Sequence, residues 1–235
     1  DHLFYACDYA QCRSCIENGK TTDKPGGKSS TDKDDGEQKN GGKNSTGTSD
    51  SFADRILVIR LAALFHDIGK PVTRKEAADG SCTFYRHEAI SEKITRSIMR
   101  RLKYSNTEIE KTAHLVAEHM FHYDYSWTDA AVRRFIVRVG KENIDDLFAL
   151  RKADIFGLTG AYAEPNFLVE FTARIDRLLK EDGAYSLKDL AVNGKDLMAI
   201  GIPAGKPLGL VLHDLLETVL DDPAQNTKEA LLPIA

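Results

Sequence analysis

The segment Arg60–Pro71, RLAALFHDIGKP, decides the fold of this sequence and indicates its chemistry. The run from residue 56 to residue 65, which ends directly before the His66-Asp67 pair, is apolar on nearly every side. Such a run is typical of a helix buried at the centre of a domain. Gly69 is a common helix-ending residue and Pro71 follows it, so the helix is expected to stop close to the His-Asp pair. The sequence therefore predicts an imidazole and a carboxylate side by side at the end of a central helix.

Helical periodicity continues through most of the remaining chain. Apolar residues recur at helical spacing in the segments 90–102, 109–120, 132–139, 144–150, 167–179 and 208–219. Asn193 with Asp196, and Asn226 with Glu229, are each expected to cap the start of a helix. Alternating strand patterns are scarce, and Cys82–Tyr85 is the best short candidate. These patterns predict an all-α fold.

One polar segment interrupts this helical pattern. Residues 18–50 include none of the apolar side chains that build a core, so burial cannot offset the entropy of ordering them. We expect a disordered insertion there. Around it we expect a first helical domain, made of residues 1–17 and 51–161, and a smaller helical subdomain of residues 162–235.

Charge and hydropathy exclude several classes of protein. The 235 residues include 32 Lys and Arg against 36 Asp and Glu, so a globally basic nucleic-acid-binding protein is excluded, although a local basic face is not. No apolar stretch approaches the length of a membrane span, and no secretory signal opens the chain. We therefore expect a cytoplasmic protein with no membrane partner.

The first residues of the chain carry two further expectations. The chain opens on Asp1 instead of Met, which suggests a fragment with an upstream partner. Cys7, Cys12 and Cys15 fit either free thiols in a reducing compartment or part of a zinc site, and we favour the free thiols because a fourth ligand is not evident.

The His66-Asp67 pair offers the mixed nitrogen and oxygen ligands that Mn²⁺, Fe²⁺, Ni²⁺, Zn²⁺ or Mg²⁺ binds. Asp67 is placed to coordinate one metal or to bridge two. Lys70 lies one helical turn beyond His66, where its ammonium group can stabilise charge on a bound phosphate. The alternative is structural: a buried histidine held by Asp67, with Lys70 solvated.

The pattern resembles the HD superfamily of metal-dependent phosphohydrolases, in which a first His, a His-Asp pair and a distant Asp bind the metal. The resemblance implies His2, His66, Asp67 and Asp154 as ligands. In members with two metals, histidines between the pair and the last Asp complete a second site, which implies His87 and His119 here. Asp67 and Lys70 would then take part in catalysis. For His87 and His119 the alternative is that they are exposed histidines at helix ends.

Over most of its length the chain is similar to the C-terminal half of bacterial tRNA nucleotidyltransferases, the family of CCA-adding enzymes and poly(A) polymerases. The similarity extends from about Ile56 to Leu232, and its most specific part is LKDLAVNGKDLMAIG at Leu187–Gly201, followed by PAGKPLG. The matching stretches before it are RLAALFHDIGKP, FYRHEAIS, LKYSN, AVRRF and RKAD. The Gly-Ser loop and paired aspartates of the family's nucleotidyltransferase head have no counterpart here, so this chain is not expected to add nucleotides without a head located upstream.

The resemblance implies two activities that are compatible. One is a divalent-metal phosphohydrolase that acts on phosphomonoesters or 2′,3′-cyclic phosphates of a nucleotide or an RNA end. The other is a body that binds tRNA for the head during 3′-end processing. The candidate phosphate contacts are Lys93, Arg96, Arg100, Arg101, Lys103, Arg133, Arg134 and Arg138, with an ordinary solvated helix face as the alternative. A free-standing HD phosphohydrolase and a catalytically silent tRNA-binding body remain as other interpretations.

Overall fold

The computed structural model of the protein describes residues 52–160, 165–181 and 185–235. Helices dominate these ranges, and the sheet found within them consists of two short strands, so the predicted all-α fold is confirmed. His2, the three N-terminal cysteines and the polar segment 18–50 lie outside the described residues. None of the described helices is long and apolar enough to cross a membrane.

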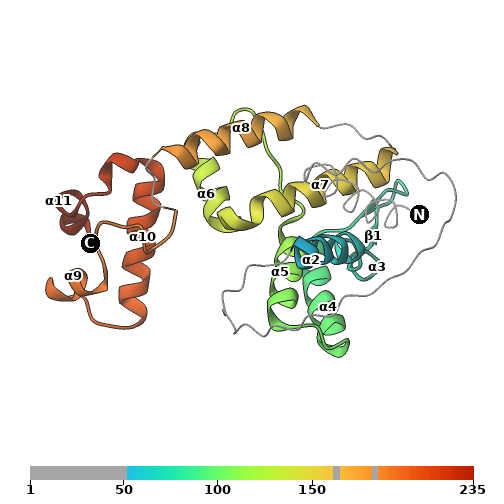
Figure 1. Ribbon diagram of the computed structural model, residues 1–235, viewed down its shortest axis with the longest axis horizontal. Coiled ribbons are helices and arrows are strands. Elements are labelled where there is room, and N and C mark those ends of the chain that lie inside the picture. Colours follow the sequence, from blue (N-terminus) through green and yellow to red (C-terminus); the bar gives the residue numbers. More distant parts are fainter. Residues whose placement is uncertain (1–51, 161–164, 182–184) are drawn as a thin grey trace, which may run out of the picture.

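A cluster of four helices and a small hairpin forms one end of the molecule (Figure 1). Its elements are α2 (Phe52–Phe65), α3 (Lys70–Thr73), β1 (Lys75–Glu76), β2 (Cys82–Thr83), α4 (His87–Arg101) and α5 (Asn106–Glu118). Helix α5 packs against both α4 and α2, and α2 also packs against α7. The side of α2 that faces this packing is buried, whereas Arg60 and Leu64 on its other side are exposed. The helix expected at the centre is therefore buried along one side only.

Three more helices continue the chain from this cluster. They are α6 (Asp129–Val139), α7 (Ile144–Thr159) and α8 (Asn166–Lys180). Aromatic rings fill the space between them. Tyr123 is stacked on Phe171 at a centroid distance of 4.1 Å, and the tilted ring of Phe135 lies 4.8 Å from the same ring. Each aromatic side chain buries a large apolar area, so these rings tie α6, α7 and α8 into the core that also holds α2 and α5.

The C-terminal helices pack around a second core at the opposite end of the molecule (Figure 1). They are α9 (Gly194–Ala199), α10 (Lys206–Asp221) and α11 (Lys228–Leu231). The first core ends with Leu178 and the second begins with Leu190. The division expected at residues 161 and 162 stays a prediction, and that position lies outside the described residues.

Ion pairs between α6 and α10 join the two cores. The Arg134 guanidinium donates to Glu217 at 2.7 Å and to Asp221 at 2.9 Å, and Arg133 donates to the Leu220 carbonyl oxygen at 3.2 Å. Val137 on the same helix packs against the second core. Helix α6 therefore contributes to both ends of the molecule.

The two predicted helix caps have different outcomes. Asn193 accepts hydrogen bonds from the backbone N–H groups of Lys195 and Asp196, and the Asp196 side chain completes a capping box, so this prediction is confirmed. The prediction for Asn226 was wrong, because Thr227 caps α11. The Asn226 amide instead bonds the backbone of the loop before α9, where its oxygen accepts from Ala191 N–H and its nitrogen donates to the Asp189 carbonyl oxygen.

Gly69 sets how closely the end of α2 approaches the start of α4. Its N–H donates to Ser91 Oγ at 2.9 Å. A Cβ atom at this position would lie 2.6 Å from the His87 carbonyl oxygen and 2.8 Å from the Ser91 nitrogen, both of which are backbone atoms. A side chain at residue 69 cannot fit without moving a helix. Glycine is therefore required by the close approach of the α4 backbone, in addition to its role as a helix-ending residue.

We predict that Gly69→Ala lowers the free energy of unfolding by about 1–3 kcal/mol, because the added methyl group overlaps backbone of α4. Urea denaturation followed by circular dichroism measures the change. Gly209→Ala is the matched control, since Gly209 lies within α10 and a Cβ there meets no atom within 4 Å. That substitution should stabilise the protein by about 0.5–1 kcal/mol. Equal effects of the two substitutions would show that the close approach of α2 to α4 is unimportant.

Candidate metal centre

The His-Asp pair lies in a tight turn directly after α2. The His66 N–H still donates to the Ala62 carbonyl oxygen at 2.8 Å, and the next hydrogen bonds follow the shorter three-residue pattern, from Ile68 to Phe65 and from Lys70 to Asp67. Pro71 stands in the first turn of α3, where its missing N–H costs no helical hydrogen bond. The imidazole of His66 is 1% exposed, so the turn holds it inside the molecule.

Three buried histidines make the same local hydrogen bond. Nδ1 of His66, His87 and His119 lies 2.7–3.0 Å from the carbonyl oxygen of the residue three positions earlier. A carbonyl oxygen only accepts, so each Nδ1 carries a proton, and Nε2 presents a lone pair whenever the imidazole is neutral. This is the arrangement in which a neutral imidazole binds a metal through Nε2 while its other nitrogen is held by the backbone.

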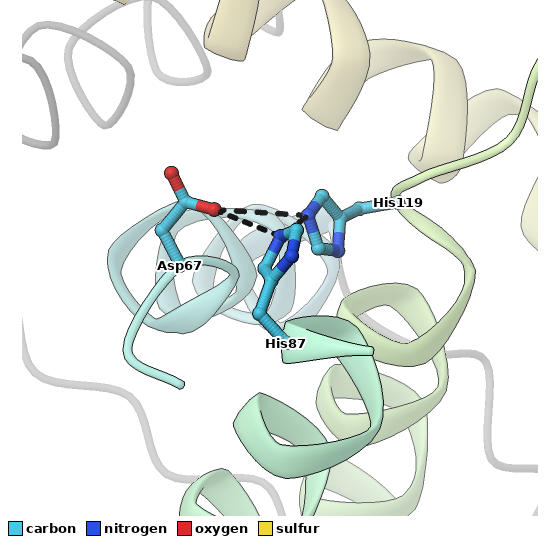
Figure 2. A group of neighbouring side chains, drawn as sticks. All are labelled: Asp67, His87 and His119. Carbon is cyan, nitrogen blue, oxygen red and sulfur yellow. Dashed lines mark hydrogen bonds and ion pairs between the residues drawn. The ribbon is translucent and has the colours of Figure 1, made fainter. Parts of the chain in front are cut away.

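The three Nε2 atoms converge on the carboxylate of Asp67, as Figure 2 shows for His87 and His119. Asp67 Oδ1 lies 3.2 Å from His87 Nε2 and 3.9 Å from His119 Nε2. Asp67 Oδ2 lies 3.3 Å from His66 Nε2, and that nitrogen is also 3.3 Å from Asp154 Oδ1. The two oxygens of Asp67 therefore face two different groups of ligands.

Burial and charge set the protonation of these groups. Burial alone would lower the pKa of His66, but the carboxylates of Asp154 and Asp67 outweigh it and raise that pKa to about 9. Burial would raise the pKa of Asp67, but His66 and Lys70 lower it well below its usual value. His119 differs because burial dominates there and lowers its pKa to about 4, so its imidazole is neutral at pH 7.

These residues fit a divalent metal ion. His87 Nε2 and His119 Nε2 lie 3.2 Å apart although both present lone pairs, a contact that a cation between them would make favourable. The donor set combines imidazole nitrogens with carboxylate oxygens, which suits Mn²⁺, Fe²⁺, Ni²⁺ or Zn²⁺ better than the all-oxygen sites that Mg²⁺ prefers. One ion would lie among Asp67, His87 and His119, and a second position would lie on the side of His66 and Asp154.

Lys70 contacts the same carboxylate. Its Nζ lies 2.6 Å from Asp67 Oδ2 and 5.8 Å from the centre of the Phe84 ring. The ammonium group therefore lies on the side of Asp67 that faces His66, and the Lys70 side chain is 40% exposed. It can meet a bound anion at the surface while it balances the charge of Asp67.

The structure brings together the predicted ligands that it describes, namely His66, Asp67, His87, His119 and Asp154. Sequence reasoning missed Ser91 and Arg151. Ser91 is fully buried one helical turn after His87, and it holds the turn that carries Asp67 by accepting the Gly69 N–H. The i, i+4 spacing from His87 was the available signal. Arg151 donates to Asp154, three residues later on α7.

The predicted RNA contacts have different surroundings. Arg96 donates to Glu92 and Glu110, Arg138 pairs with Glu118, and Arg133 and Arg134 join α6 to α10. Lys93, Arg100, Arg101 and Lys103 are exposed at the surface. At 100° per residue, Lys93 and Arg100 lie on the side of α4 opposite His87.

Comparison with known proteins places these features in a family. The chain is 32% identical over 168 residues to the A-adding tRNA nucleotidyltransferase of Deinococcus radiodurans and 31% identical over 176 residues to the CC-adding tRNA nucleotidyltransferase of Thermus thermophilus. These alignments cover 70% and 74% of this chain, which spans about 38% of the length of either relative. No solved structure matches the chain significantly. The family described as tRNA nucleotidyltransferase domain 2 matches residues 82–235, and the chain therefore belongs to the tRNA nucleotidyltransferase family.

Proposed function

We propose that this chain is the body of a tRNA nucleotidyltransferase, which binds tRNA while a nucleotidyltransferase head extends the 3′ end. The observation that carries the proposal is the family match over residues 82–235, which includes α4–α8 and the whole C-terminal core. The two relatives are named for the addition of A and of CC to tRNA. A free-standing phosphohydrolase explains the His-Asp cluster but gives no role to the C-terminal helices, so we favour the tRNA-binding body.

The outer side of α4 is the best candidate for contacts with tRNA phosphates. Lys93 and Arg100 present exposed cations there, and Arg101 and Lys103 are exposed at the C-terminal end of the helix and just beyond it. Arg96, Arg134 and Arg138 have carboxylate partners that an RNA phosphate would have to displace. We therefore assign the larger share of binding to the four exposed cations, and Arg133, Arg134 and Arg138 remain secondary candidates.

We predict that the double substitution Arg100→Gln, Arg101→Gln weakens tRNA binding and reduces the slope of log affinity against log salt concentration by about 1 for each residue. Fluorescence anisotropy with labelled tRNA at several salt concentrations measures both quantities. Arg177→Gln is the control, because the guanidinium of Arg177 on α8 is held by Asp129 at the start of α6 and by Glu181, and the slope of this variant should equal that of the unmodified protein. An unchanged slope in the double variant would assign these cations to an ordinary solvated surface.

We further propose that the His-Asp cluster is a metal-dependent phosphohydrolase site. The supporting observation is that three imidazole Nε2 atoms gather around the Asp67 carboxylate and that a second carboxylate, Asp154 on α7, lies beside His66. A cluster of this kind has no evident structural purpose, because two buried Nε2 atoms that both lack a proton repel each other.

The roles of the residues follow from this geometry. His66, Asp67 and Asp154 would hold one ion, and Asp67, His87 and His119 would hold another. Such an ion, when bound, supplies a water of lowered pKa and a positive charge for the phosphate oxygens. The carbonyl oxygens that bind Nδ1 keep each imidazole pointed inward, and Lys70 stabilises charge that develops on the phosphate.

We predict that Asp67→Asn weakens Mn²⁺ binding by at least about 100-fold, because the amide removes the charge shared by both groups of ligands. Titration calorimetry measures the affinity, and thermal denaturation gives a second readout. Mn²⁺ at about 100 times its dissociation constant should stabilise the unmodified protein by about 2.7 kcal/mol and the variant far less.

Asp176→Asn, on the exposed surface of α8, is the matched control and should leave Mn²⁺ binding unchanged. Retained Mn²⁺ affinity in Asp67→Asn would rule out the metal centre. Normal Mn²⁺ binding without hydrolysis of 4-nitrophenyl phosphate would leave a structural metal in a catalytically silent body.

A further inference from the structure

Arg151 lies beside the candidate metal centre, and the protein does not provide acceptors for all of its buried hydrogen-bond donors. It stands on α7 three residues before Asp154, and its Nη1 donates to Asp154 Oδ2 over a long distance of 3.4 Å. Its guanidinium carbon lies 6.0 Å from the centre of the Phe121 ring. Its Nε is buried and has no hydrogen-bond partner.

Other arginines of this protein are held more tightly. Arg134 donates to two carboxylates at 2.7 and 2.9 Å, and Arg174 donates to Asp129 through two nitrogens at 2.9 and 2.7 Å. A guanidinium has five N–H donors, and native proteins seldom leave a buried donor unmatched. A charged group left in this state next to a reactive centre is the arrangement expected when a ligand supplies the missing acceptors.

Arg151 and Lys70 flank the same point. Lys70 rests on Asp67 and Arg151 rests on Asp154, and both carboxylates lie 3.3 Å from the same atom, His66 Nε2. Each carboxylate therefore has one long cationic side chain beside it, and both carboxylates share the imidazole of His66. A phosphomonoester dianion presents three terminal oxygens and two negative charges to these cations, whereas a diester presents two terminal oxygens and one charge.

We propose that Arg151, together with Lys70, binds the terminal oxygens of a phosphomonoester dianion, so that this site takes phosphomonoesters in preference to diesters, 2′,3′-cyclic phosphates included. The inference rests on the proposed hydrolase function. In the reaction a water oxygen forms a bond to phosphorus and the ester P–O bond breaks. The alcohol leaves with one proton of the water, and hydrogen phosphate remains. Arg151 acts here as a substrate-binding residue through its planar, forked donors.

The first test compares Arg151→Lys with Arg177→Lys, a matched loss of a guanidinium away from the centre. In Mn²⁺-loaded protein, kcat/KM for 4-nitrophenyl phosphate should fall about 10- to 100-fold in Arg151→Lys, mainly through KM, because a lysine keeps the charge but loses the fork. The value for bis(4-nitrophenyl) phosphate should change less than about threefold, since a diester offers no second charge. Arg177→Lys should change neither value.

The second test does not depend on turnover. Inorganic phosphate binding to Mn²⁺-loaded protein, measured by calorimetry, should weaken about 10- to 100-fold in Arg151→Ala, and guanidinium ion should restore part of the loss. Mn²⁺ affinity and the melting temperature show whether the variant is folded and loaded.

The outcomes separate the two proposals. Equal losses on both substrates, or phosphate binding that does not respond to Arg151, would overturn the role of this residue. Phosphate binding that depends on Arg151 without any hydrolysis would instead overturn the proposed hydrolase function and leave Arg151 as an anion-binding residue.

Discussion

One short-range hydrogen bond orients His66, His87 and His119 alike: Nδ1 donates to the carbonyl oxygen three residues earlier. The bond is local, so each imidazole is fixed in direction and tautomer by its own stretch of chain. What the tertiary structure must add is only the meeting of three chain segments, at the end of α2, the start of α4 and the end of α5. Gly69 allows the first two to meet at backbone contact, and Ser91 joins them. These histidines therefore depend on helix ends, which packing can bring together without bending a helix, whereas Asp154 comes from within α7.

The charges around the centre follow from this placement. Two carboxylates are largely removed from water, and the free energy of that burial must be offset by nearby cations. Asp67 is paired with Lys70 and with the imidazole of His66. Asp154 is paired with Arg151 and with the same imidazole. A divalent ion would take over part of this role from His66. Protein cations and a metal ion are thus alternative partners for the same carboxylates.

Much of this was predictable from sequence, because the signals were local. The helix that ends at His66 was visible in its apolar pattern and its glycine, and the cap at Asn193 was visible in its spacing from Asp196. His66, Asp67, His87, His119 and Asp154 were expected from a family resemblance, and the structure brings them together. The roles of Asn226 and Arg134 were beyond such reasoning, because their partners lie on other elements. The unmatched Nε of Arg151 was also beyond it, because burial of that atom depends on packing. Sequence spacing carries no information about which carboxylate comes within reach of a long side chain across a helix interface.

Helix α4 serves two surfaces at once, with a buried histidine at its start and exposed cations on its far side. Because both surfaces lie on one helix, they keep a fixed position relative to each other. No side chain is shared between them. Substitutions that remove the imidazoles would leave the cationic surface in place, and substitutions that remove the cations would leave the imidazoles in place. Related proteins can therefore lose the metal centre and retain the cationic surface, or the other way round. The loss of a single histidine in a relative would not indicate whether that relative still binds RNA.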